Sequence, residues 1–386
     1  MEKKTIVKKD WVSNFTLIGK PIINDYSFKV DEKSEKSNWV YNALNLGVDC
    51  GEKFGTVYAE CMSGYSEESE NKIFAHGKDE NGNDDFSKKI EVDWEDRFND
   101  EVLEEIGDLS FITVGLEKTS EGKTFYKKFL SAYDAIAYVK EHLAKDMVIN
   151  VKGNLKYSAY NGNTQVRKNI NSIVLSKVDD PANFKATFTQ TVLLDKDSAS
   201  LKKIDKDKGV IYVDAKVLDY VKEVNGVEVK GQYPYNKQFE FEMDFSNEAV
   251  CKKIMEKLFK VKKGVSQITF EGEFIEGGAI VTATLDDVPD DIKSLIGVLY
   301  TEEEVLAKCT ANGNRERRMV LKKPQIKLVG EDKIPVIQIF PERYTEDDLV
   351  LDYLFDNKSN KPDEDEVPFG VDSESEDDDM AWLNQL

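Results

Sequence analysis

Flat aromatic side chains stand near lysines or arginines at several places along this sequence. In the first half they are Trp39, Tyr41, Tyr58, Tyr126, Lys127, Lys128, Tyr157, Tyr160, Arg167 and Lys168, and in the second half Tyr233, Tyr235, Lys237, Arg315, Arg317, Arg318, Lys322 and Lys323. Rings that stack on bases and cations that pair with phosphates are what a protein needs to hold a single-stranded nucleic acid without reading its sequence. Two plain alternatives remain open. Trp39, Tyr41 and Tyr58 are equally suited to fill a barrel core. Loop residues such as Tyr160, Tyr235 and Arg315 are equally suited to lie in solvent.

Residues for covalent or metal-dependent catalysis are sparse. There are two histidines, His76 and His142, and the cysteines are scattered without a C-x-x-C pair, so neither a zinc site nor a catalytic triad is indicated. Residues 117–124 resemble the end of a phosphate-binding loop. The first glycine of that motif is missing, however, and a hairpin turn explains the segment better. We therefore expect a protein that is not an enzyme and has no cofactor or bound metal. We expect buried free thiols at Cys50, Cys61, Cys251 and Cys309.

The formal net charge of −21 is unevenly distributed. Residues 63–108 carry a net charge of −11 and residues 356–386 a net charge of −9, so the remainder of the chain is close to neutral. That remainder can still present a local positive groove to a polyanion. No apolar run reaches the roughly 20 residues of a membrane helix, and the N-terminus carries no secretory signal. These features predict a cytoplasmic protein without a membrane partner.

The candidate side chains are carried mainly by predicted strands. Residues 39–50 and 56–62 alternate apolar and polar positions on either side of a glycine-bearing turn, which predicts an antiparallel hairpin. Residues 63–108 are interpreted as an acidic insertion with a loop at 79–85. Within it Trp94, Phe98, Val102 and Ile106 follow helical spacing and predict one short amphipathic helix.

The order strand, helix, glycine-bearing strand occurs twice. In the first copy a strand over 124–130 precedes a helix that Ser131 can cap, with Asp134 completing a capping-box pattern. In the second copy a strand over 239–243 precedes a helix from Ser246. Gly153 in the following strand of the first copy matches Gly272 in that of the second, at an offset of 119 residues, which favours two copies of one domain. The second copy adds a helical insertion near 289–308, where Thr301 and Glu304 form another capping-box pattern.

Residues 124–177 resemble the single-stranded DNA-binding proteins of bacteria and phages, whose domain is a five-stranded OB barrel with a helix after the third strand. The similarity lies in Val151, Gly153 and Leu155, which form the V-x-G-x-L run of the fourth strand, and in Asn171-Ser172-Ile173 downstream. The C-terminus is similar to the acidic tail of that family. Residues 363–369 place acidic residues before Val-Pro-Phe, and a second acidic run, Asp377, Asp378 and Asp379, leads to Trp382 and Leu383.

The resemblance implies an all-β-dominated protein of tandem OB-type barrels with an acidic, disordered C-terminal tail. We expect one barrel in residues 1–180, a second in 181–345 and the tail in 346–386. The implied function is sequence-independent binding and protection of single-stranded DNA in replication or recombination. The tail would offer Phe369 or Trp382 to replication proteins, or occupy the protein's own groove. Long insertions favour a bacteriophage member of the family, acting in the host cytoplasm.

Two other functions remain open. The overall acidity suits a decoy that mimics DNA to occupy a host nuclease or defence protein, and such a decoy would not bind DNA itself. A virion protein built of β-domains would form a large stable assembly and show no salt-dependent DNA binding.

Overall fold

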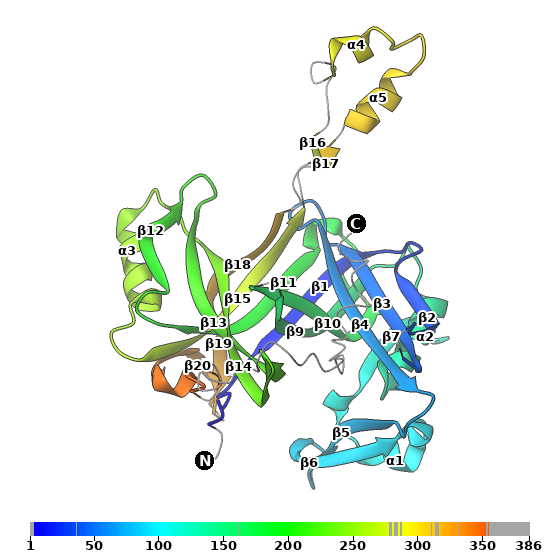
Figure 1. The fold of residues 1–386 in the computed structure, drawn as a ribbon, viewed down its shortest axis with the longest axis vertical. Coiled ribbons are helices and arrows are strands. Elements are labelled where there is room, and N and C mark those ends of the chain that lie inside the picture. Colours follow the sequence, from blue (N-terminus) through cyan, green and yellow to red (C-terminus); the bar gives the residue numbers. More distant parts are fainter. Residues whose placement is uncertain are drawn as a thin grey trace, which may run out of the picture.

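The computed structural model describes residues 4–354, apart from residues 36, 161, 278–279, 282–284, 286–287, 310, 313–315, 331 and 353. The fold is dominated by β-strands, as expected, and Figure 1 shows two strand-rich lobes side by side with a helical arm projecting from one end. None of the helices in this part of the chain has both the length and the apolar character needed to cross a membrane.

Five strands and one helix form the first barrel. They are β1 (Ser13–Ile22), β3 (Trp39–Asp49), β4 (Thr56–Ser66), β9 (Ile149–Tyr160), β10 (Asn163–Leu175) and α2 (Ala132–His142). β1 pairs with β3 and β9, β3 with β4, β4 with β10 in parallel, and β10 with β9, so the ring closes. With the helix between its third and fourth strands, this is the connectivity of an OB barrel. The predicted hairpin over 39–62 is confirmed as β3 and β4.

A second ring repeats the same connectivity. Its elements are β11 (Lys185–Leu194), β13 (Val210–Val224), β14 (Val227–Glu242), β15 (Val265–Gly277), β18 (Glu316–Pro324) and α3 (Glu248–Ile254). β11 pairs with β13 and β15, β13 with β14, β14 with β18 in parallel, and β18 with β15. The two rings thus share one topology, and the helix and glycine-bearing strand of the predicted repeat are equivalent in them, α2 with α3 and β9 with β15.

The first strands of the two rings pair with each other. β1 and β11 run antiparallel, with Phe15 directly opposite Phe188. Phe15 also lies opposite Gly153 in its own ring, and Phe188 lies opposite Gly272 in the other. The two phenylalanines and the two glycines thus occupy equivalent positions, and the pairing of β1 with β11 joins the rings about a local pseudo-twofold axis.

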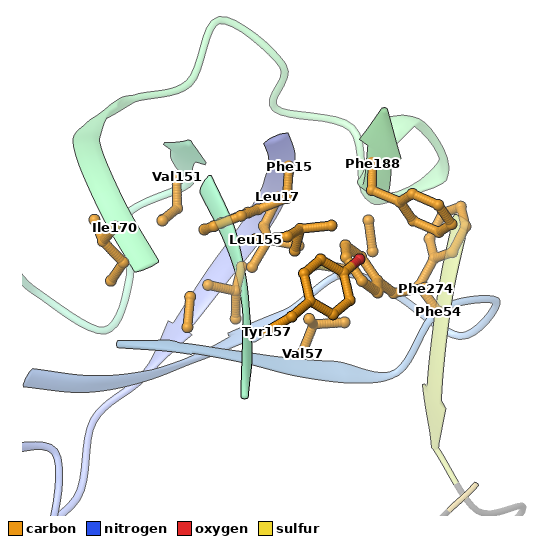
Figure 2. Close-up of a cluster of buried hydrophobic side chains, with 14 of the residues drawn as sticks. Phe15, Leu17, Phe54, Val57, Val151, Leu155, Tyr157, Ile170, Phe188 and Phe274 are labelled. Carbon is orange, nitrogen blue, oxygen red and sulfur yellow. The ribbon is translucent and has the colours of Figure 1, made fainter. Parts of the chain in front are cut away.

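One apolar core runs through both rings. Figure 2 shows Phe15 and Leu17 of the first ring in the same cluster as Phe188 and Phe274 of the second. The rings of Phe188 and Phe274 lie 4.9 Å apart. Gly153 and Gly272 make room for this packing. An added Cβ would lie 1.8 Å from the carbonyl oxygen of Asn169 at Gly153, and 2.3 Å from the Phe188 ring at Gly272.

Several strands and one helix are added to the first ring. They are β2 (Phe28–Lys33), β5 (Lys72–Lys78), β6 (Asp84–Asp93), α1 (Asp100–Glu105), β7 (Ile112–Lys118) and β8 (Thr124–Phe129). β8, the strand before α2, lies outside the ring, whose third strand is β4. The amphipathic helix predicted over 94–106 is wrong in extent. Trp94–Asp96 forms a separate 3-10 turn, and the helix begins only at Asp100. Phe98 lies between the two, outside the helix, and its side chain is exposed.

Both predicted N-terminal helix caps in the described chain are present, with one difference. Ser131 Oγ accepts a hydrogen bond from the backbone N–H of Tyr133, but Asp134 pairs with Arg97 at 2.8 Å and does not complete a capping box. Thr301 and Glu304 bond reciprocally through side chain and backbone, as a capping box requires.

The second ring carries a strand, an arm and a C-terminal extension. These are β12 (Ala199–Asp205), the arm with β16 (Ile280–Val281), α4 (Asp290–Lys293), α5 (Glu302–Cys309) and β17 (Ala311–Asn312), a π-helical turn at Met255–Phe259, and then β19 (Ile326–Val329), β20 (Ile334–Ile337) and β21 (Ile339–Tyr344). The arm contains the helical insertion expected near 289–308.

Both ends of the described chain pack against the second ring. Ile6, Leu349 and Leu351 are buried in one cluster with residues of β11, β13 and β15. The Tyr344 hydroxyl donates to the backbone carbonyl of Val7 at 2.9 Å. The expected tail boundary at residue 346 is therefore wrong, because residues up to Leu351 contribute to the core. Residues 355–386 lie outside the described chain.

The cysteine prediction is confirmed at three of its four positions. Cys50, Cys61 and Cys251 are buried free thiols, and the side chain of Cys309 lies outside the described part. Burial raises the pKa of Cys50 and of Cys61 to about 12. Because the thiolate is the reactive form, we expect iodoacetamide at pH 8 to leave Cys50 and Cys61 unmodified in the native protein and to modify both in urea. Peptide mass spectrometry checks this at each site, and rapid native labelling of either would contradict it.

Candidate nucleic-acid interface

The outer face of β3 and β4 gathers the aromatic candidates of the first barrel. Side chains of a strand alternate between two faces, and Leu44, Leu46 and Val48 point into the core. The other set points outward. Cross-strand pairing places Tyr41 opposite Gly64, and Gly47 opposite Tyr58. We refer to Trp39, Tyr41, Tyr58 and Met62, with Lys29 of β2 and Arg167 of β10, as the β3–β4 face.

Trp39 and Tyr41 form a stacked pair on this face. Their ring centroids lie 5.0 Å apart with an interplanar angle of 14°. The Lys29 ammonium donates to the Tyr41 hydroxyl at 3.2 Å and lies 5.6 Å from the centre of that ring. Tyr41 is buried beneath these neighbours, while Trp39 is half-buried. Trp39 is therefore the ring of this pair that a base can reach, with a cation close by.

Two glycines provide the space in which these rings lie. A Cβ on Gly64 would come within 2.8 Å of both Trp39 and Tyr41, and one on Gly47 within 3.1 Å of Tyr58. An aromatic ring directly across from a strand glycine covers exposed backbone. This packing explains why the rings lie along the sheet, and it leaves Tyr58 half-buried at the surface.

Arg167 lies beside this face in an ion pair that the second barrel repeats. Its guanidinium is 3.8 Å from Glu60, and at the equivalent position Arg318 bonds Glu240 at 2.7 Å. Burial raises the pKa of Glu60, against the lowering effect of Arg167 and Lys168. The side chain of Arg318 is 18% exposed, whereas that of Arg167 is 35% exposed. Arg167 is thus the more accessible of the two to a phosphate.

The equivalent face of the second barrel is polar at the positions that correspond to Gly47, Tyr58 and Met62, although it carries one half-buried ring, Tyr212 of β13. The strand registers match Tyr58 with Gln238, Met62 with Glu242, and Gly47 with Asp214. Gln238 donates to Asp214 at 2.8 Å, so two polar side chains stand where the first barrel has a ring over a glycine. Of the two outer faces, only that of the first barrel therefore offers aromatic surface at these positions.

Tyr157 and Tyr235 are buried, in contrast to the surface positions expected for them. Tyr157 is 4% exposed, and its hydroxyl donates to Gln190 at 2.9 Å. Tyr235 lies in the middle of β14 and points into the core, not in a loop. Burial raises the pKa of Tyr157, and it raises the pKa of Tyr235 to about 12. Neither ring is available to a base.

Tyr233 and Lys237 lie on the same inward face of β14. The rings of Tyr233 and Tyr235 pack edge to face at 4.9 Å. Lys237 is half-buried, and burial together with the charge of Lys168 lowers its pKa. Lys168 itself bonds the buried Glu276 at 2.5 Å and lies over the Phe274 ring. These residues join the two barrels, so the structure does not bring them to the β3–β4 face.

The remaining candidates are spread over other surfaces. Tyr126 is exposed on β8 beside Lys127, whose ammonium lies 4.6 Å from the Tyr138 ring, and Lys128 pairs with Asp108 at 3.0 Å. Tyr160 is exposed at the end of β9. On β18 Arg317 is exposed, while Lys322 and Lys323 pair with acids of neighbouring strands. Arg315, Phe369, Asp377, Asp378, Asp379, Trp382 and Leu383 lie outside the described residues.

One trio of polar side chains was not indicated by any sequence motif. Ser110 Oγ lies 2.9 Å from His76 Nδ1, and His76 Nε2 lies 2.6 Å from Asp84 Oδ1. The same serine oxygen accepts from the backbone N–H of His76, and the same aspartate oxygen accepts from that of Leu109. These bonds to the backbone show that the trio has a structural role, in which it holds the β5–β6 hairpin against the loop at residues 109–110. Among the residues described, no three His, Cys, Asp or Glu side chains group as metal ligands would.

Sequence reasoning missed Lys29, Gly47 and Gly64. The glycines carried a signal, because the register of the predicted hairpin already places each opposite an aromatic residue. Lys29 carried none, since it reaches the face through the pairing of β2 with β3.

No protein-family model and no curated protein matches this chain. A crystal structure of a deletion mutant of the single-stranded DNA binding protein from Thermus aquaticus is similar at 11% identity, over 69% of this chain and 87% of that one, with a TM-score of 0.30. The assignment of two OB barrels to this chain rests on its own strand pairing.

Proposed function

We propose that this protein binds single-stranded DNA without sequence preference and protects it during replication or recombination. The observation that carries the proposal is the β3–β4 face of a closed OB barrel, where the half-exposed Trp39 stacks on Tyr41 and Lys29 contacts Tyr41. OB barrels commonly bind oligonucleotides on this part of their surface. The polar character of the equivalent second face supports the first barrel as the principal contact.

The acidic tail has a separate role in this proposal. Residues 356–386 carry a net charge of −9 and end with Trp382 and Leu383 near the C-terminus. A polyanionic segment competes with DNA for the cations of the same molecule. Its apolar end provides an anchor for replication proteins.

The test is a fluorescence-anisotropy titration of labelled oligo-dT across a range of salt concentrations. It compares the full chain with one ending at residue 355. We expect binding that weakens as salt rises, and an affinity about tenfold higher for the shortened chain at low salt, because the competing charge is gone. A chain in which the tail acids are replaced by their amides is the matched control and should behave like the shortened one. Absence of binding by every variant at low salt would overturn the proposal and favour the DNA-mimic alternative.

A further inference from the structure

A run of lysines covers the end of α3, the π-helical turn and the residues that follow them in the second barrel. We refer to residues 252–263 as the lysine segment. Its apolar residues face the core, where Phe259 is buried and Ile254 and Leu258 pack against it. Its exposed side chains are all charged, and they are Lys252, Lys253, Glu256, Lys257, Lys260, Lys262 and Lys263. The lysine segment thus carries a net charge of +5 in a chain whose net charge is −21.

Five of the six lysines lack an acidic partner. Lys252 pairs with Glu248 at 2.7 Å, whereas within the described chain the other five form no ion pair. The dipole of the last helical turn stabilises Lys252 and Lys253. Lys257 and Lys260 follow at helical spacing, however, where like charges repel each other. The lysine segment therefore carries a repulsion that no anion of the described chain offsets, which indicates an external anionic partner.

The composition of the lysine segment favours a nucleic-acid backbone as that partner. Protein interfaces have aromatic and apolar side chains at their centre and are depleted in lysine, but no apolar side chain of this segment is exposed. A helix that binds a membrane surface also needs an exposed apolar face. The lysine ammonium is a compact charge on a flexible stem. It can pair with phosphates along a flexible strand without reading the bases.

The equivalent helix of the first barrel has no such charge. Residues 132–147, which comprise α2 and the loop after it, contain two lysines and three acidic residues. The stacked rings show the opposite distribution. Trp39 and Tyr41 lie on the first barrel, whereas the second barrel has Gln238 and Asp214 where the first has Tyr58 and Gly47. Rings suited to bases thus lie on one barrel, and the run of lysines suited to phosphates lies on the other.

We propose that the lysine segment is a second DNA contact, which holds the phosphates of a strand whose bases stack on the β3–β4 face. This inference rests on the function proposed above. Figure 1 shows α3 on the outer side of one lobe, and β3 and β4 on the other lobe. A strand held on the β3–β4 face is present near the lysine segment at a high effective concentration, provided that it is long enough to reach it. The second contact therefore forms only with long strands.

Titrations with oligo-dT of two lengths test this inference. An oligonucleotide of about 8 nucleotides fits a single OB fold, and one of about 35 exceeds what two such folds hold. Lys253→Gln combined with Lys257→Gln and Lys260→Gln should leave the affinity for the short one within about twofold of the wild type. For the long one it should weaken binding by about tenfold or more at low salt. The slope of log affinity against log salt should fall by about 2, because three phosphate contacts are lost.

A matched control removes the same charge from other places. Lys145→Gln combined with Lys222→Gln and Lys333→Gln replaces three exposed lysines outside the lysine segment. This variant has the same net charge as the test variant, so it shows any effect of net charge alone. We expect it to bind the long oligonucleotide like the wild type. Circular dichroism verifies that both variants are folded.

The result that overturns the inference is a test variant that binds the long oligonucleotide as its control does. The proposed function would stand in that case, provided that Trp39→Ala still weakens binding at both lengths. Absence of binding by the wild type at either length would instead overturn the proposed function, and this inference with it.

The acidic tail is the other anion that the lysines could hold, and a shortened chain distinguishes it from DNA. The three lysine substitutions should weaken binding of the long oligonucleotide by the same factor in the chain that ends at residue 355. A loss confined to the full chain would show that the tail occupies the lysine segment, and would overturn the inference.

Discussion

Gly272→Ala is expected to lower the free energy of unfolding by about 2–4 kcal/mol, because the added methyl group overpacks the core. This is the upper end of what overpacking by one methyl group costs. The new Cβ would lie 2.3 Å from the Phe188 ring, which is itself buried. The ring cannot move without disturbing Phe274, which packs against it. Urea unfolding followed by circular dichroism measures the change. Gly231→Ala is the control, because its nearest neighbour is the Val229 carbonyl oxygen at 3.6 Å. We expect it to stay within about 0.5 kcal/mol of the wild type.

Double variants distinguish the obstacles that an added methyl group meets at the two equivalent glycines, a side chain at Gly272 and the backbone at Gly153. Phe188→Leu should recover part of the loss in Gly272→Ala, because a shorter side chain vacates the position of the new methyl group. Phe15→Leu should not rescue Gly153→Ala, since the nearest obstacle there is the backbone oxygen of Asn169 at 1.8 Å. A Gly272→Ala variant as stable as the wild type would contradict the packing described for this core.

Trp39→Ala and Tyr58→Ala are each expected to weaken binding of oligo-dT by about 5- to 100-fold, as the loss of one stacked base implies. Both rings lie half-exposed on the β3–β4 face, with Trp39 supported by Tyr41. Trp39→Phe should restore most of the affinity, because it returns a flat ring to the site. The anisotropy titration measures these constants at a fixed salt concentration.

Gln238→Ala is the matched control for Tyr58→Ala. It alters the equivalent position of the second barrel, where no ring is present, and should leave the affinity within about twofold of the wild type. Equal losses from both substitutions would show that the two barrels contribute alike. Losses from Gln238→Ala alone would place the principal contact on the second barrel and contradict the role assigned to the β3–β4 face.

Local patterns in the sequence were sufficient for many elements of the fold. Alternation of apolar and polar residues identified the hairpin over 39–62, because strand periodicity is visible in the chain itself. The side chain of Ser131 indicated a helix start, as did the pair Thr301 and Glu304. The matching glycines at 153 and 272 indicated a repeat, and the structure gives each the same role opposite a buried phenylalanine.

The position of the barrel strands was decided by the tertiary structure. The sequence contains a strand directly before α2, but the ring closes through β4, which is far earlier in the chain and pairs in parallel with β10. Which strands pair across such distances depends on the packing of the whole core. No local pattern contains that information.

The same distinction holds for the candidate site. Residue type identified Trp39 and Tyr58 as possible stacking rings, and their alternation showed that each lies on one definite face. Only the packing of the second barrel against the first decided that Tyr157 and Tyr235 are buried, and that Lys168 forms an ion pair with Glu276. The sequence by itself thus determined the chemistry that the chain possesses. Contacts between distant strands decided which of those side chains remain at the surface, because burial is a property of both partners and a sequence pattern describes only one.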